Sequence, residues 1–443
     1  MFLDDEYRFS SKIYFCEFER SLVANTDRML NVDEALTRVL DGFAPLDPVR
    51  VGLQHALGLV LAEDVVAPHD VPYKDNSALD GYALRASDVQ GATVGSPAKL
   101  TVIADLAAGR TAEVFVKSGE AVRIMTGATI PQGADAVIGF EDTDRLDWGK
   151  LGSDPQSAKD DNSIVGITES IQAGNAIRRA GEDIRQNDVS IASGAMVTPG
   201  GIGVLASIGY TNISVHPRPV VSIVPTGDEI IEINKPMSSG KVRNSHAWAL
   251  EALVRSAGAT PYRTSIVSDD IQDVRDALFE ASENSDLILT IGGVSMGDYD
   301  LVKTVIGEEQ LDFWQVLMKP GKPLVMGRIN DVPILGLPGN PVSGLVVFEL
   351  FGRPAIMKMM GYTDLQRICV KATATFAIPG GDGRRMFARV LVDQLDGEFV
   401  CKPTGDQGSG IMSSMAAANG LAIVPEDIQG IAVGETVLVL LLT

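Results

Sequence analysis

The sequence predicts a multidomain protein of the α/β plus β class, and three observations support this fold class. The chain has 443 residues, more than a single hydrophobic core usually organises. Between residues 219 and 360, apolar strand-like runs alternate with helical segments, as they do in a doubly wound sheet. On either side, at 99–139 and 367–442, short β-rich segments punctuated by glycine and proline predict two smaller β domains.

The composition is that of a globular protein with a strong negative charge. Lys and Arg total 37 against 58 Asp and Glu, which gives a formal net charge of −21. This charge argues against nucleic acid or an anionic membrane surface as a partner, because both attract a positive field. The three cysteines (Cys16, Cys369 and Cys401) lie far apart and have no metal-ligand spacing. With no membrane-spanning apolar stretch and no signal-peptide pattern, we expect a cytoplasmic protein.

The N-terminal half mixes helices with short strands. Residues 1–28 lack periodicity, and we expect a flexible extension outside the fold. Apolar spacing predicts helices at 33–40, with Asp33 and Glu34 in the first turn, and at 51–57. Asp80 before Gly81 is a turn signal. The remaining expected elements are strands at 99–104, 112–116, 121–125 and 136–139 and a helix at 199–208.

In the region from 219 to 360, predicted β-strands alternate with predicted α-helices. We expect four strands, each followed by a helix in the pattern of a doubly wound sheet. The strands are expected at 220–224, 261–267, 287–291 and 332–337, and the helices at 247–257, 271–281, from 301, and from 343 to 360. The short strands that follow, at 367–375, 385–393, 399–402, 421–424 and 436–442, predict a C-terminal β-barrel or sandwich.

A glycine-rich turn follows the central strand at 287–291. The residues 292–300 read Gly-Gly-Val-Ser-Met-Gly-Asp-Tyr-Asp. Glycines let a backbone approach a ligand closely, and the Ser295 hydroxyl is a donor for a phosphate oxygen. Asp298 and Asp300 are suitable ligands for Mg²⁺, which prefers carboxylate and phosphate oxygens. The alternative interpretation is a solvated strand-to-helix turn.

Other strands of this region also end in polar turns. In open α/β sheets the carboxyl ends of parallel strands form one ligand-binding edge. Carboxylates, lysines and glycine turns together suit a metal-chelated phosphate with a second anion nearby. No phosphate-binding P-loop and no Gly-x-Gly-x-x-Gly pattern occurs, so we expect a Mg²⁺-dependent enzyme acting on a phosphorylated or nucleotide-linked small molecule. The side chains concerned are Asp228, Glu229, Asp269, Asp270, Asp298, Asp300, Lys319, Lys322 and Ser343.

Seven motifs, in this order, give the chain a resemblance to a known family. They are Ser-Ala-Leu-Asp-Gly-Tyr-Ala (77–83), Arg-Ile-Met-Thr-Gly-Ala (123–128), Arg-Ala-Gly-Glu-Asp (179–183), Pro-Thr-Gly-Asp-Glu (225–229), the glycine turn at 292–300, Lys-Pro-Gly-Lys-Pro (319–323) and Leu-Pro-Gly-Asn-Pro-Val-Ser (337–343). Over residues 29–443 the chain resembles the molybdopterin molybdenumtransferase family (MoeA), which includes the E domain of gephyrin.

The resemblance implies a domain order. A doubly wound MogA-like α/β domain is joined to an extended helical linking domain, an inserted small β domain and a C-terminal β-barrel. The implied boundaries are 1–28 for the extension, 29–71 with 184–217 for the linking domain, 72–183 for the inserted β domain, 218–362 for the α/β domain and 363–443 for the barrel.

The resemblance also implies an activity. Molybdate is inserted into adenylylated molybdopterin, the pyrophosphate link is hydrolysed with Mg²⁺ (or Zn²⁺), and AMP leaves. The implied assembly is a homodimer, with a cleft between the α/β domain of one subunit and the β domain of the other, and molybdopterin adenylyltransferase is the implied substrate donor. Two rival functions remain: molybdopterin adenylyltransferase itself, and a gephyrin-like scaffold without catalysis.

Site roles follow from the resemblance residue by residue. The implied catalytic carboxylates are Asp80, Asp183, Glu229, Asp269 and Asp300, with Asp269 and Asp300 also handling metal and pyrophosphate. The implied pterin and phosphate cradle is Thr226, Gly227, Asp228, Gly292, Gly293 and Ser295, and the implied molybdate pocket is Lys319, Lys322, Pro323 and Ser343. Two features depart from the family pattern: His246 replaces a usual asparagine, and the loop 145–168 is longer than usual.

Overall fold

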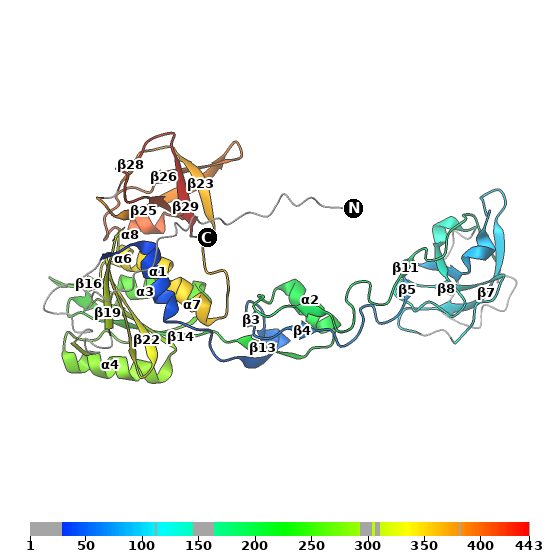
Figure 1. The fold of residues 1–443 in the computed structure, drawn as a ribbon, viewed down its shortest axis with the longest axis horizontal. Helices are drawn as coiled ribbons and strands as arrows, with labels where there is room; N and C mark the ends of the chain where they lie inside the picture. Colours follow the sequence, from blue (N-terminus) through cyan, green and yellow to red (C-terminus); the bar gives the residue numbers. More distant parts are fainter. Residues whose placement is uncertain are drawn as a thin grey trace, which may run out of the picture. The chain divides into compact units, whose positions relative to one another are not determined.

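The computed structural model describes residues 29–110, 113–144, 164–292, 304–305, 311–380 and 382–442 (Figure 1). The chain divides into two compact units. The first, here the α/β unit, contains the chain up to Phe43 together with Pro219–Ile356 and Gln366–Thr443. The second, here the β unit, contains Ala44–Arg218 and Met357–Leu365. In the described part of the chain, no helix has the length and apolar character needed to cross a membrane.

A seven-stranded mixed sheet forms the centre of the α/β unit. Its order is β1-β19-β21-β22-β18-β14-β17, and β22, β18, β14 and β17 pair in parallel. The buried runs predicted as strands are confirmed, except that the strand expected at 261–267 is shorter. The bounds are β1 Met29–Leu30, β14 Val220–Pro225, β17 Thr260–Arg263, β18 Leu287–Ile291, β19 Leu311–Val316, β21 Pro323–Ile329 and β22 Val332–Leu337.

Helices cover both faces of this sheet. Figure 1 shows α4 along one face and α3 on the other. Helix α4 (Ile271–Asn284) begins where the Asp270 carboxylate caps the backbone N–H groups of the first turn, and it buries Val274 and Leu278 against the sheet. Helix α3 (Ser245–Ser256) is capped by Asn244 in the same way. The doubly wound arrangement is therefore confirmed, and it brings the polar turns after the strands to one edge.

The segment after β22 is helical, but it is not one regular helix. Helix α6 (Pro341–Val347) starts with proline at its first position, where a missing N–H costs nothing. A five-residue π-helical stretch, Phe348–Gly352, follows, and then α7 (Arg353–Met359). Buried Glu349 in the π-helical stretch is paired with Arg367, with 3.2 Å between Oε2 and Nε. The predicted helix through 360 is thus correct in extent and interrupted within.

The first described segment belongs to the α/β unit. Strand β1 pairs with β19, and helix α1 (Val32–Asp41), capped by Asn31, follows it. The Asp33 carboxylate receives two hydrogen bonds from the Arg385 guanidinium, at 2.9 and 3.0 Å. These contacts differ from the sequence analysis, which grouped 29–71 in one linking domain. The division into linking, inserted β, α/β and barrel domains that the resemblance implies stays a prediction.

A closed β-barrel forms the C-terminal part of the α/β unit. Five strands run in the order β25-β26-β23-β29-β27, and pairing of β27 with β25 closes the ring. The core is apolar, with Ala388, Val390, Val424 and Val439 fully buried. The elements of this part are β20 Met318–Lys319, β23 Cys369–Ala374, β24 Ile378–Pro379, β25 Arg385–Leu395, β26 Glu398–Pro403, α8 Met412–Ala416, β27 Gly420–Val424, β28 Gly430–Ile431 and β29 Thr436–Leu441.

The β unit contains a five-stranded sheet with the order β10-β7-β8-β6-β9. At the start of β6, Gly81 has no room for a side chain, because an added Cβ would lie 1.8 Å from the Ile138 carbonyl oxygen. The expected strand at 112–116 is wrong for its described residues, 113–116, which form only an isolated bridge at Phe115. The bounds are β6 Gly81–Leu84, β7 Ala98–Leu106, β8 Glu120–Ile124, β9 Ala136–Gly139 and β10 Ile164–Ile167, with short helices at Ala86–Val89 and Phe140–Asp142.

The rest of the β unit is built from short strand pairs and one helix. The helix predicted at 51–57 is wrong, because residues 49–52 pair as a strand with β13 and only 53–55 make a 3₁₀ turn. The helix predicted at 199–208 is confirmed as α2, Pro199–Ser207. The strands are β2 Val49–Gly52, β3 Val60–Leu61, β4 Val65–Val66, β5 Asn76–Ser77, β11 Ile177–Arg178, β12 Val189–Ile191 and β13 Asn212–His216.

Candidate functional site

Two glycine turns meet at the carboxyl ends of β14 and β18. Gly227 has a φ of +140° and Gly292 a φ of +87°, backbone conformations that glycine adopts readily. Thr226 ties the turns together, because its backbone N–H and its hydroxyl both donate to the Ile291 carbonyl at 3.2 Å. A Cβ on Gly292 would lie 3.3 Å from the Thr226 carbonyl oxygen, so the two backbones pass closely. The sequence prediction that these turns lie at one edge is confirmed.

Carboxylates cluster beside these turns; Asp228, Glu229 and Asp269 are here called the acidic turn. The Asp228 backbone N–H donates to the Asp269 carboxylate at 3.1 Å, and the Asp269 N–H donates to the Asp228 carboxylate at 3.2 Å. Glu229 folds back over Gly227, because a Cβ on Gly227 would lie 2.5 Å from its carboxylate. All three residues are exposed. The turn therefore presents several negative oxygens at one point of the edge.

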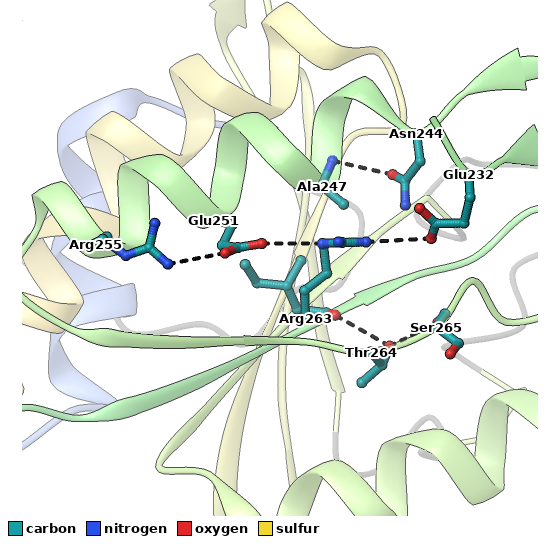
Figure 2. Close-up of polar contacts among 9 residues, drawn as sticks. Glu232, Asn244, Ala247, Glu251, Arg255, Arg263, Thr264 and Ser265 are labelled. Atoms are coloured by element: carbon teal, nitrogen blue, oxygen red, sulfur yellow. Dashed lines mark hydrogen bonds and ion pairs between the residues drawn. The ribbon is translucent and has the colours of Figure 1, made fainter. Parts of the chain in front are cut away.

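A charged network braces the segment between the acidic turn and α3. Figure 2 shows the Arg263 guanidinium between Glu232 and Glu251, with separations of 3.4 and 3.2 Å. The same guanidinium lies 4.2 Å from the centre of the Trp248 ring, a cation–π contact. Glu232 follows β15 (Ile230–Ile231), which pairs with β16 (Val242–Arg243). Arg263 thus ties β17 and α3 to the segment that continues from the acidic turn.

The lysine turn, residues 319–323, packs against α6. Gly321 has a φ of +100°, and a Cβ there would lie 2.4 Å from a Val347 methyl group and 3.3 Å from the Ser343 carbonyl oxygen. Lys319 is exposed, Lys322 and Pro323 are half-buried, and Ser343 is buried. The four residues expected to bind an oxyanion therefore come from two segments in direct contact.

Two buried polar side chains near this edge had no role in the sequence analysis. His246 is 5% exposed and Asn244 is 2% exposed. His246 packs over Gly344, where a Cβ would lie 2.1 Å from the imidazole. Neither ring nitrogen of His246 nor the Asn244 amide nitrogen has a hydrogen-bond partner among the described residues. Burial lowers the pKa of His246 to about 4, against a smaller opposing effect of the Gly339 backbone. The ring is therefore neutral near pH 7.

The remaining expected carboxylates, Asp80 and Asp183, belong to the β unit. The Asp80 carboxylate accepts hydrogen bonds from the Thr126 backbone N–H at 2.7 Å and from its hydroxyl at 2.8 Å. These bonds hold the pKa of Asp80 below its usual value, with a further contribution from Arg123. Asp183 is exposed, and its N–H donates to the Val71 carbonyl at 3.0 Å.

The structure brings together only part of the predicted site. Within the α/β unit, the turns after β14, β17 and β18 lie at one edge, and the lysine turn lies against α6. Gly293, Ser295 and Asp300, with the neighbouring Asp298, lie outside the described residues. Among the described residues, no group of three or more His, Cys, Asp or Glu side chains is arranged to hold a metal ion.

Family models match three successive parts of the chain. The model described as MoeA N-terminal region (domain I and II) matches residues 30–209. The model described as Probable molybdopterin binding domain matches residues 222–358, the part that carries both the acidic turn and the lysine turn. The model described as MoeA C-terminal region (domain IV) matches residues 371–442.

Similar proteins cover nearly the whole chain. Molybdopterin molybdenumtransferase 2 of Mycobacterium tuberculosis is 37% identical over 413 residues, which cover 92% of this chain and 98% of that protein. The molybdopterin molybdenumtransferase of Bacillus subtilis is 36% identical and covers 93% and 94%. The crystal structure of a molybdopterin biosynthesis MoeA protein from Pyrococcus horikoshii matches with a TM-score of 0.77 at 30% identity, covering 94% of this chain and 100% of that chain. The chain therefore belongs to the MoeA family of molybdopterin molybdenumtransferases.

Proposed function

We propose that this protein inserts molybdate into adenylylated molybdopterin, with hydrolysis of the pyrophosphate link and release of AMP. The observation that carries the proposal is the pairing of Asp228 with Asp269 at the carboxyl edge of the same sheet whose β22 leads into Ser343, against which the lysine turn packs. Carboxylates suit a cation that neutralises a pyrophosphate, and lysines suit a small oxyanion. The names of the relatives support the same reaction.

The metal ion in this proposal is Mg²⁺, with Zn²⁺ as the alternative. The donor chemistry fits, because exposed carboxylate oxygens are the ligands that Mg²⁺ prefers, and Mg²⁺ is commonly bound by one or two carboxylates together with substrate phosphates. Asp269 and Asp300 would hold it. When bound, the ion would offset the charge of the pyrophosphate and polarise its phosphorus atoms.

The protein's own side chains do the remaining work in this proposal. Lys319 and Lys322 bring positive charge to a chain whose net charge is −21, and they hold molybdate near the pterin. Glu229, which folds over Gly227, accepts a proton from the water that attacks phosphorus. The turns at Gly227 and Gly292 let the backbone approach the phosphates closely.

Release of AMP from adenylylated molybdopterin, with Mg²⁺ and molybdate present, tests the reaction. We expect Asp269→Asn to slow AMP release by roughly a hundredfold or more, because it removes a charge from the metal site. Asp276→Asn is the matched control: it removes an exposed carboxylate from α4, where Asp276 contacts only Gln272 among the described residues, and its rate should equal that of the wild type. A folded wild type that releases no AMP with molybdate would favour a scaffold. Pyrophosphate formation from ATP and molybdopterin would instead favour the adenylyltransferase.

We also propose a homodimer in which Asp80 and Asp183 of one subunit serve the acidic turn of the other, with molybdopterin adenylyltransferase supplying the substrate. Mixing two inactive variants, Asp80→Asn and Asp269→Asn, tests the dimer. Random exchange of subunits would restore about a quarter of wild-type activity, because half of the dimers then contain one intact site. No recovery in a mixture that forms mixed dimers would contradict a shared cleft.

A further inference from the structure

Strand β25 contacts the lysine turn directly. Its first two residues, Arg385 and Met386, pair with Met318 and Lys319 of β20. In addition, the Arg385 backbone N–H donates to the Leu317 carbonyl at 2.9 Å. The barrel strand thus fixes the backbone at the point where the lysine turn begins, so the position of Lys319 depends on β25.

Three residues farther along β25, Arg389 is fully buried. It is 0% exposed, and the nearby Asp406 carboxylate favours its charged form without a described ion pair between the two side chains. Its guanidinium donates to the Ser414 hydroxyl at 3.0 Å and to the Asp406 and Gly408 carbonyls at 2.9 and 3.1 Å. Burying a cation is costly, and hydrogen bonds to the charged group offset part of that cost.

The backbone of Arg389 also forms hydrogen bonds with the segment that contains Asp406 and Gly408. Its N–H donates to the Gln407 side-chain oxygen at 2.8 Å, and its carbonyl accepts from the Gln407 amide at 3.1 Å and from the Thr404 backbone N–H at 3.0 Å. Residues 404–410, here called the barrel loop, therefore form hydrogen bonds with the backbone of Arg389 as well as with its side chain.

The barrel loop contacts the beginning of α6. The Val342 backbone N–H, which lies in the first turn of α6 and has no partner within the helix, donates to the Ser409 carbonyl at 3.2 Å. Val342 directly precedes Ser343. One strand, β25, is therefore connected to Lys319 through β20 and to Ser343 through the barrel loop.

We propose that Arg389 is a positioning residue that sets the spacing between the lysine turn and Ser343 for a tetrahedral oxyanion. This inference rests on the proposed function, because molybdate is the oxyanion in question. Arg389 does not touch the substrate in this proposal: it holds the barrel loop, and the loop holds the first turn of α6. An oxyanion pocket made of two segments is sensitive to their separation, since displacements of about 1 Å change binding and rate strongly.

Three variants of the full-length protein test the role of Arg389. Arg389→Met keeps the length of the side chain and removes its donors, and Arg389→Lys keeps a charge with one donor group. Asn419→Ala is the matched control, because Asn419 clamps the Val392 backbone on the same strand, at 2.7 and 2.9 Å, without a described contact to α6. The measurements are molybdate affinity by calorimetry and amide hydrogen exchange of residues 338–347.

We expect Arg389→Met to weaken molybdate binding on the order of tenfold to a hundredfold and to speed exchange at 338–347, with Arg389→Lys intermediate. Asn419→Ala should lower the melting temperature and leave molybdate affinity within about twofold, because it acts on stability alone. Unchanged affinity in a folded Arg389→Met, or in Arg389→Lys if the Met variant does not fold, overturns the proposal, as does equal weakening by Asn419→Ala. If the wild type binds no molybdate, the proposed function fails, whereas the exchange data still decide whether Arg389 holds α6.

Discussion

Asp228 and Asp269 hold each other through two reciprocal hydrogen bonds, each carboxylate accepting the backbone N–H of the other residue. The residues follow two neighbouring parallel strands, β14 and β17. The pair therefore links two strand-end turns through hydrogen bonds in both directions and presents two carboxylates at one point of the edge.

This relationship makes Asp228 a support for Asp269. We predict that Asp228→Ala lowers kcat/KM for AMP release about tenfold, because the Asp269 N–H loses its acceptor and the turn moves. The melting temperature should change little, since both residues are exposed. Steady-state AMP release checks this prediction, and Asp228→Asn, which keeps an acceptor oxygen, should recover most of the activity. Equal rates for Asp228→Ala and wild type would mean that Asp269 needs no such support.

Gly321 fixes the lysine turn against α6. We predict that Gly321→Ala weakens molybdate binding and lowers the free energy of unfolding by about 2 kcal/mol, because the new methyl group would overlap Val347 and the φ of +100° disfavours alanine. Gly91→Ala is the control: its φ is +78°, but nothing lies within 4 Å of the added Cβ. Calorimetry and denaturant unfolding separate the two effects.

If the two alanine variants lose stability equally and Gly321→Ala binds molybdate normally, backbone strain explains the result and the packing of the turn on α6 is irrelevant. A loss of affinity confined to Gly321→Ala supports the oxyanion pocket, because only that variant displaces the segment carrying Lys319 and Lys322.

The alternation of strands and helices after residue 219 could be predicted from the sequence because each buried strand is a continuous apolar run. Leu287–Ile291 is buried at every position, as its sequence predicts. The edge that unites Thr226, Asp269 and Gly292 follows from the parallel order of strands, so the sequence could place those residues together without any coordinates. The roles assigned to them stay predictions.

Features that depend on pairing between distant segments were not predictable. The sequence predicted a helix at 51–57, yet residues 49–52 pair with β13, about 160 residues later in the chain. Strand β1 likewise pairs with β19, which lies far along the chain. Arg389 was overlooked because an arginine in a strand looks exposed, and only the closed barrel buries it.

The network around Glu251 offers a direct comparison of a half-buried and an exposed ion pair. Glu251 bonds both Arg263, whose side chain is 17% exposed, and Arg255, whose side chain is 66% exposed. We predict that Arg263→Ala lowers the free energy of unfolding by about 1–3 kcal/mol, because it leaves Glu232 and Glu251 with fewer partners and uncovers Trp248. Arg255→Ala should cost about 0.5 kcal/mol or less. Urea unfolding of both variants checks this, and similar losses would show that burial does not strengthen the Arg263 pair.

His246 gives the fold a pH dependence whose sign can be worked out. Burial lowers its pKa from 6.5 to about 4, so the unfolded chain binds a proton at a pH where the folded chain does not. Above pH 6.5 the residue is neutral in both states and has no effect. As the pH falls from 6.5 towards 4, the unfolded state gains protons first and stability is lost. No described carboxylate forms a hydrogen bond with either ring nitrogen, so none offsets this loss of stability.

We therefore predict that wild type loses about 2 kcal/mol more stability than His246→Asn between pH 7 and pH 5, because asparagine does not titrate. Urea unfolding at several pH values measures this difference in slope, which is independent of the packing change that the substitution causes at any one pH. His216→Asn is the control, since that half-buried ring contacts the Leu46 carbonyl at 2.7 Å and is not buried without partners. Parallel pH profiles for wild type and His246→Asn would mean that the imidazole is protonated in the folded protein and has a partner beyond the described residues.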